Sequence, residues 1–131
     1  MVDLTPQRRD ALMRLFNKAM FARDMAALYQ VVTPDFSWRV AIGPTAPVGR
    51  ALGDAQAIAQ YLDERARTYD QLRFNDVAIY HAPDCSFVSF RLSGRRRADD
   101  SAVDVLGLER FAFRDDRIEL KDAYWKHIGA E

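Results

Sequence analysis

Cysteine is nearly absent from this sequence, since Cys85 is the only one among its 131 residues. A single cysteine excludes a disulfide bond within the chain, and it excludes a zinc site built from several thiolates of one chain. All apolar runs fall well short of the ~20 residues that a membrane-spanning helix needs. The N-terminal stretch also lacks the basic, then apolar, then small-residue order of a secretory signal. These absences predict a soluble, cytoplasmic protein.

An excess of charge of either sign is missing as well. Nineteen lysine and arginine side chains balance nineteen aspartate and glutamate side chains, so no overall field attracts nucleic acid or an anionic membrane. The basic run Arg95–Arg97 is followed by Asp99 and Asp100, which is typical of a self-neutralising hairpin tip. There is no glycine-rich phosphate loop, no His-x-x-x-His pair and no Gly-x-Ser-x-Gly elbow. We therefore expect no nucleic-acid or membrane partner, no metal and no cofactor.

Three helices are predicted in the first half of the chain. Thr5 is a good N-cap before a proline, and apolar residues at three- and four-residue spacing follow over residues 12–20. Asp24 indicates the start of a second, short helix that ends at Thr33-Pro34. Asp54 indicates the start of a third helix.

Alternating apolar and polar residues predict five strands. They are Phe36–Ile42, Leu72–His81, Ser86–Ser93 and two long strands within Val103–Trp125 that meet at a tight turn, Asp115-Asp116. The glycine- and proline-rich segment Gly43–Gly53 is predicted to be an irregular loop. Helices grouped early and consecutive strands late indicate one α+β domain, in which a curved antiparallel sheet wraps over a helical layer.

Glu109 is the best chemical clue in these strands. Alternation places it on the same face as Phe111 and Phe113. It is then either a general acid or base that apolar neighbours hold protonated near neutral pH, or a buried glutamate paired with an arginine or lysine of the helical layer, or a strand end open to water.

Five segments resemble, in their order and spacing, the nuclear transport factor 2-like superfamily, and most closely its small bacterial SnoaL-like and ketosteroid-isomerase-like members. They are Ala22–Tyr29 (ARDMAALY), Pro34–Trp38 (PDFSW), Gly49–Asp54 (GRALGD), Phe87–Phe90 (FVSF) and Phe113–Ile118 (FRDDRI). The resemblance implies a single SnoaL-like domain over residues 1–131. It implies a cone-shaped fold in which the sheet curls around three helices and leaves a pocket at its open end.

The catalytic residues of these relatives carry over only in part. Of the three catalytic positions of ketosteroid isomerases, the tyrosine falls at Phe16, the aspartate at Val40 and the protonated acid at Glu109. This sequence therefore retains one of the three catalytic residues that the resemblance implies, the acid. The loss of the other two argues against steroid isomerisation by that mechanism. The acid/base aspartate of SnoaL-like cyclases falls nearest to Lys121, with Asp122 pointing to the other face. The Asp–Arg–Asp set of limonene-epoxide-hydrolase-like members is not assembled.

Further candidates for a pocket come from the strands. His81 is in register with Val77 and Ile79, so it either faces the cone, where an imidazole suits proton transfer, or lies at the surface as a strand-end residue. Aromatic side chains either line a pocket for a flat hydrophobic ligand or belong to the core. They are Trp38, Phe90, Phe111, Phe113 and Trp125. The predicted ligand-binding set consists of these residues without Phe113, together with Phe16, Val40 and Lys121 from the resemblance.

Two functions remain open at this point. The first is an enzyme without a cofactor, an isomerase, cyclase or hydrolase that uses Glu109, assisted by His81, on a small hydrophobic ligand. The second is a module that binds a ligand without chemistry, or a homodimer formed through the sheet. Ile118 and Leu120 share a face with Tyr124 and lie opposite Lys121 if alternation is regular. A strand that is apolar on both faces is usually covered on both sides, which favours a dimer.

Overall fold

The computed structural model describes residues 4–41 and 49–128. The elements are α1 (Pro6–Ala22), α2 (Met25–Val31), β1 (Val32–Ala41), β2 (Arg50–Leu52), α3 (Ala55–Thr68), β3 (Tyr69–His81), β4 (Cys85–Arg96), β5 (Ala102–Arg114) and β6 (Arg117–His127). The predicted order of elements is confirmed, with one short strand added. That strand, β2, lies in the segment predicted to be a loop. Ile42 and positions 43–48 of that segment lie outside the described residues.

All three predicted helix starts are confirmed, because each is set by a local capping interaction. The Thr5 hydroxyl accepts a hydrogen bond from the backbone N–H of Arg8 at 3.1 Å. Asp24 and Asp54 cap α2 and α3 by accepting from the backbone N–H groups three residues on, at 3.0 and 2.7 Å. Helix α1 ends at Arg23, whose φ of 55° turns the chain sharply into α2.

Six strands form one sheet in the order β2-β1-β6-β5-β4-β3. All neighbours are antiparallel except β1 and β6, which run parallel. The sheet is therefore mixed at one pair, where the sequence predicted antiparallel pairing throughout. A parallel pair needs a long crossover, and most of the chain, from β2 to β5, supplies it.

Two irregularities decide which side chains face the helices. In β3 the register shifts between Asn75 and Ala78, where a bulge interrupts the alternation of the strand. In β6 the register shifts so that Phe113 pairs with Ile118, whereas Ala112 pairs with Leu120. The face predicted for Ile118 is wrong for this reason: it is fully buried in the core, opposite the face of Leu120 and Tyr124.

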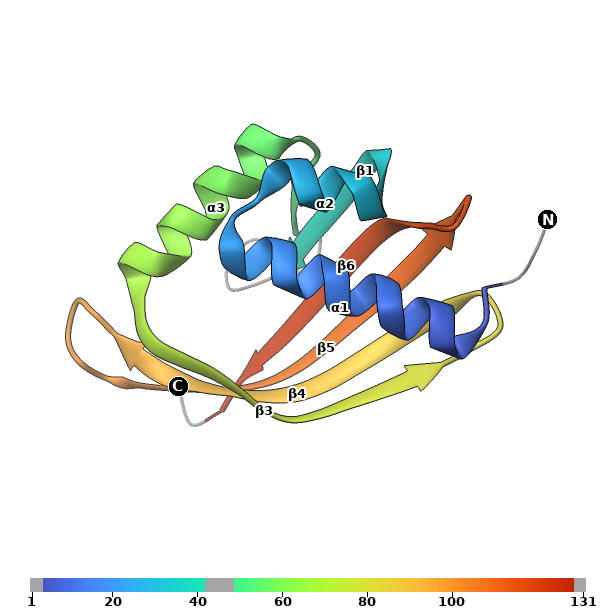
Figure 1. Ribbon diagram of the computed structural model, residues 1–131. Helices are drawn as coiled ribbons and strands as arrows, with labels where there is room; N and C mark the ends of the chain where they lie inside the picture. The colour runs from blue at the N-terminus through green and yellow to red at the C-terminus, as the bar shows by residue number, and fades with distance from the viewer. Residues whose placement is uncertain (1–3, 42–48, 129–131) are drawn as a thin grey trace.

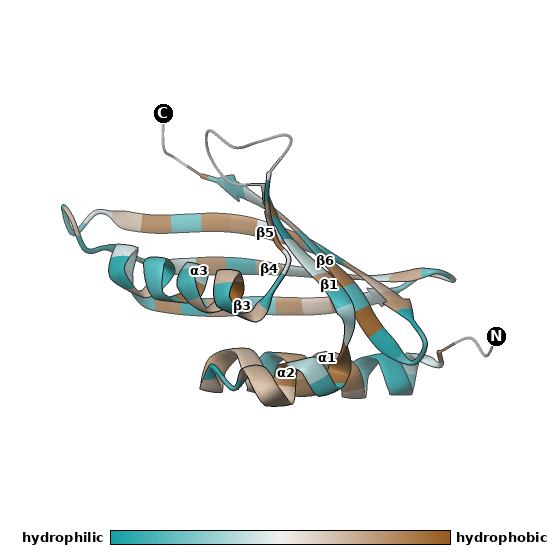
Figure 2. Ribbon diagram, turned by 90° about the horizontal axis from the view of Figure 1, so that it is seen from above, coloured by the Kyte–Doolittle hydropathy of each residue, from teal (hydrophilic) through white to brown (hydrophobic). Residues whose placement is uncertain are grey.

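The helices lie on one side of the curved sheet, and the core fills the space between the two layers (Figure 1). Along the strands, hydrophobic and hydrophilic bands alternate (Figure 2), as expected for a sheet with one covered face. Phe16 of α1 is at the centre, edge-on to Phe36 and Phe111 at 5.8 and 5.7 Å between ring centroids. The fold is the predicted α+β cone. No helix among the described residues is long and apolar enough to cross a membrane.

Candidate functional site

A cavity of about 250 Å³ lies between the concave face of the sheet and helices α1 and α3. Its apolar wall consists of Met20, Phe21, Trp38, Leu62, Phe74, Val77, Val88 and Phe90. Its polar lining residues are Asn17, Arg65, Glu109 and Lys121. This volume is slightly below the usual range for pockets that hold drug-sized molecules, so the cavity suits a small ligand.

The cavity opens between the C-terminal end of α1 and the edge strand β3. Phe21, Phe74 and Val77 line it and are at the same time exposed to solvent, by 79%, 37% and 55%. Exposed apolar side chains of this size at the rim of a hollow are typical of a site that admits an apolar molecule.

Glu109 reaches the cavity from β5, between Val88 of β4 and Ala123 of β6. Its side chain is buried, and its Oε2 lies 3.4 Å from Nζ of Lys121, which is equally buried. The partner of this buried acid is therefore a lysine of the neighbouring strand, whereas the sequence suggested a cation of the helical layer. A buried carboxylate without such a partner would carry a large desolvation cost.

Lys121 lies beside two aromatic rings. It pairs in register with Trp38 of β1, and its Nζ lies 4.3 Å from the centroid of that ring and 5.3 Å from the ring of Phe16. Burial lowers the pKa of Lys121 from its ordinary value, Glu109 opposes this effect, and the positive charge of Arg65 lowers the pKa further. Lys121 therefore gives up its proton more readily than an exposed lysine does.

Arg65 brings a second cation to the cavity from α3. Its guanidinium carbon lies 6.0 Å from the Trp38 ring, and burial lowers its pKa. Within residues 4–41 and 49–128, no carboxylate lies within ion-pair distance of Arg65. Two cations therefore face one carboxylate, Glu109, and this balance favours a ligand that carries an oxygen with negative character.

The predicted aromatic residues divide between the cavity and the core. Trp38 and Phe90 line the cavity, whereas Phe16 and Phe111 are closely packed against each other with 0% and 2% exposure. Val40 and Trp125 line a second hollow, on the other side of Arg65, together with Tyr61 and Tyr69. Phe113 packs at the edge of the core beside Arg9 of α1.

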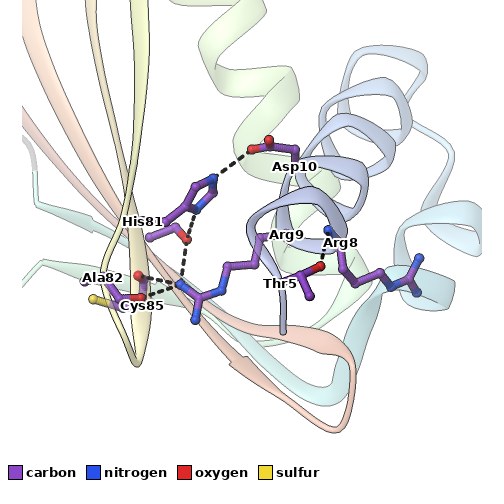
Figure 3. Close-up of polar contacts among 8 residues, drawn as sticks. Thr5, Arg8, Arg9, Asp10, His81, Ala82 and Cys85 are labelled. Carbon is purple, nitrogen blue, oxygen red and sulfur yellow. Dashed lines mark hydrogen bonds and ion pairs between the residues drawn. The ribbon is translucent and has the colours of Figure 1, made fainter. Parts of the chain in front are cut away.

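His81, for which the sequence left both a cone-facing and a surface position open, contacts Asp10 of α1 at the end of that helix away from the cavity. Its Nε2 lies 2.9 Å from Oδ1 of Asp10, and its Nδ1 lies 2.8 Å from the hydroxyl of Ser86 (Figure 3). The cavity contacts α1 only from Asn17 onward, and His81 is not among its described lining residues. The structure does not bring His81 together with Glu109.

Sequence reasoning did not identify Arg65 as a site residue, although a signal was present. Arg65 follows Ile58 by seven residues and Leu62 by three, so it continues the apolar stripe of α3. An arginine at the end of such a stripe either reaches solvent beyond the core or lines a cavity within it. The edge-strand residues Phe74 and Val77 were missed because the bulge between them obscures alternation.

Comparison with known proteins places this geometry in context. A family model described as a SnoaL-like domain matches residues 12–120. Comparison with curated proteins gives no significant match. An NTF2-like protein from Burkholderia xenovorans is similar in structure, with a TM-score of 0.79 at 15% identity over 93% of this chain and 92% of that one.

Two further solved structures are similar at comparable identity. A candidate polyketide cyclase from Xanthomonas campestris has a TM-score of 0.72 at 15% identity, over 92% of this chain and 91% of its own. A candidate isomerase from Bacillus subtilis has a TM-score of 0.69 at 17% identity, over 92% and 87%. At such identities the likeness establishes a shared fold.

Proposed function

Because the chain belongs to the SnoaL-like domain family, we propose that it binds a small, largely apolar molecule in the cavity and that Glu109 carries out acid/base chemistry on it. The observation that supports this most is the position of the Glu109 carboxylate. It lies with Lys121 in the wall of a largely apolar cavity that opens to solvent.

The arrangement suits proton transfer next to an oxygen. Glu109 takes a proton from the bound ligand, while Lys121 and Arg65 stabilise the negative charge that develops on a ligand oxygen. The indole N–H of Trp38 is a further buried donor without an acceptor among the described residues. Isomerisation and cyclisation use such a step, and in hydrolysis the same carboxylate takes the proton from the attacking water. Similar folds include a candidate cyclase and a candidate isomerase.

Thermal unfolding with a ligand panel tests the binding half of this proposal. The panel comprises steroids, aromatic polyketide-like compounds, terpene epoxides and fatty acids. A ligand present at 100-fold its dissociation constant adds about 2.7 kcal/mol to the stability of the folded state. For a domain of this size we expect a rise in Tm of about 10 °C. An unchanged Tm throughout the panel would argue for a filled core and against a ligand site.

The substitution Glu109→Gln tests the chemical half. Glutamine keeps the shape of the side chain but cannot exchange the proton, so we expect turnover of a ligand identified by the panel to fall by about 100-fold or more. The ligand-induced rise in Tm should persist. Glu119→Gln in the same hairpin is the matched control, because Glu119 pairs with Arg114 at the surface. Full activity of the Glu109→Gln protein would rule out the proposed role.

A second candidate function has its own support on the other face of the sheet. Leu106, Leu108 and Tyr124 are 46%, 45% and 50% exposed, and Leu108 pairs directly with Tyr124 across β5 and β6. A contiguous apolar patch of this kind is typical of a protein interface. We propose that a second copy of the chain covers it, so that the protein forms a two-fold dimer through the sheet.

A further inference from the structure

We propose that Lys121 is a nucleophilic amine, which condenses with the carbonyl group of a small aldehyde or ketone bound in the cavity to form an imine. This inference rests on the proposed function, because it requires the same cavity to hold a small molecule. It adds the class of ligand, a carbonyl compound, and a covalent step.

The geometry places the amine where a ligand can reach it. Lys121 lines the cavity, and its Nζ is held over the face of Trp38 at 4.3 Å. Glu109 is the only carboxylate within 4.0 Å of Nζ among the described residues, and the separation is 3.4 Å. Tight charge-assisted hydrogen bonds between nitrogen and oxygen are about 2.7–2.9 Å long. The pair is therefore loose enough for the amine to turn toward a ligand.

The surroundings of Lys121 also favour the form that reacts. Burial penalises the ammonium ion, and the Arg65 guanidinium repels it, so the pKa of Lys121 is lowered although Glu109 and the ring faces of Trp38 and Phe16 attract the charge. Only the neutral amine attacks a carbonyl carbon. Lys18 and Lys126, the other two lysines of the chain, are exposed, so they serve as internal references for an amine outside the cavity.

In the proposed reaction, Glu109 first accepts a proton and later donates it. The Lys121 ammonium first transfers a proton to the Glu109 carboxylate. The neutral amine then attacks the carbonyl carbon, forming a carbon–nitrogen bond, and a proton passes from the attacking nitrogen to the carbonyl oxygen to give a carbinolamine. The Glu109 carboxylic acid then protonates the leaving hydroxyl, so that water departs, the protonated imine forms and Glu109 returns to its carboxylate form. One water leaves for each carbonyl consumed, and no oxidant or reductant is involved.

A lysine retained only to neutralise Glu109 would behave differently. Arginine is the more common choice for a buried ion pair, because its guanidinium stays charged and binds a carboxylate with two hydrogen bonds. A purely structural Lys121 would be a protonated amine shielded from reagents. It would therefore react more slowly than the exposed Lys18 and Lys126.

Reductive trapping with benzaldehyde and cyanoborohydride separates these two cases. The hydride reduces the imine to a stable secondary amine, and peptide mapping by mass spectrometry reads each of the three lysines and the N-terminal amine separately. At about pH 6.5 we expect Lys121 to be modified at least about 10-fold faster than Lys18 or Lys126, because its lowered pKa enlarges the fraction of neutral amine. The advantage should shrink as the pH approaches that of ordinary lysine titration.

Controls distinguish failure of this inference from failure of the proposed function. Benzyl alcohol, which has the same ring but no carbonyl, should raise Tm and slow modification of Lys121 alone. Lys121→Arg should abolish labelling at that position, and because the main measurement uses the unaltered protein, it does not depend on the folding of this variant.

If Lys121 is modified no faster than Lys18 and Lys126, the proposal that Lys121 forms an imine is wrong. If benzyl alcohol or a panel ligand still raised Tm, the proposed acid/base function would stand without it. If nothing raised Tm, both proposals would be wrong.

Discussion

At the scale of single residues, the most unusual group is the buried Arg9 near the start of α1. Its guanidinium donates hydrogen bonds to the backbone carbonyls of Ala82, Pro83 and Cys85 at 2.6, 2.8 and 2.9 Å, as Figure 3 shows for two of them. It also lies 3.3 Å from the hydroxyl of Ser86. The turn between β3 and β4 therefore closes around a cation that joins it to α1. Together with His81, which contacts Asp10 and Ser86, this cluster joins the β3–β4 turn to α1.

We predict that Arg9→Met lowers the free energy of unfolding by about 3 kcal/mol. The methionine fills part of the volume but leaves several carbonyl oxygens of the turn without donors, and each buried unsatisfied group costs about 1–3 kcal/mol. Urea unfolding measures the loss. Arg8→Met is the matched control, because Arg8 pairs with Asp116 at the surface, where ion pairs contribute at most about 1 kcal/mol. Equal losses for the two variants would contradict this account.

The element scale is best illustrated by the close contact between strands β4 and β5. Gly107 pairs with Phe90, and the Phe90 ring lies across the glycine. A Cβ atom added at Gly107 would lie only 2.2 Å from two carbons of that ring. Because Phe90 also lines the cavity, the glycine determines where this part of the cavity wall stands.

We predict that Gly107→Ala pushes the Phe90 ring into the cavity. Ligand affinity should fall about 10-fold, and the free energy of unfolding should decrease by about 1–3 kcal/mol, as for other overpacked cores. Calorimetric titration with a ligand from the panel measures the first effect, and urea unfolding measures the second. Gly53→Ala is the control, since a Cβ there meets nothing within 4 Å. Unchanged affinity in the Gly107 variant would mean that the ligand does not contact Phe90.

Local signals in the sequence were sufficient to predict where the helices begin and on which face of the sheet Glu109 lies. The N-caps Thr5, Asp24 and Asp54 act within a few residues, and alternation in β5 continues without a break through Glu109. These features depend only on neighbours along the chain. They were therefore predictable from the sequence alone.

The pairing of Glu109 with Lys121 was not predictable in this way. A regular hairpin after the turn at Asp115-Asp116 would place Lys121 opposite Arg110, on the face away from the helices. The bulge next to Leu120 instead pairs Lys121 with Phe111 and brings it to the side of Glu109. The position of a bulge in a strand depends on packing between elements that are distant in the sequence. The local sequence pattern therefore does not predict it.

At the scale of the whole molecule, the exposed apolar patch on the outer face of the sheet is the basis of the proposed dimer. We predict that sedimentation velocity at micromolar concentration gives twice the mass of one chain. Leu108→Asp should convert the protein to a monomer, because a charge buried at a subunit interface costs several kcal/mol. Leu15→Asp on α1 is the control, since Leu15 is exposed to the same 45% but lies on the helical side. A monomeric unaltered protein would contradict the proposed dimer.

The parallel pairing of β1 with β6 has a consequence for how the protein reaches its native state. Trp38 and Lys121 are register partners, although roughly eighty residues separate them along the chain. Closing a loop of that length costs conformational entropy, and this cost comes before the contact between the two residues can offset it. Proteins dominated by such distant pairings fold slowly for their size. Both residues line the cavity, so an intermediate that has formed its helices and its β3–β4 hairpin still has no complete site. Binding of a ligand in the cavity therefore indicates that β1 and β6 have paired.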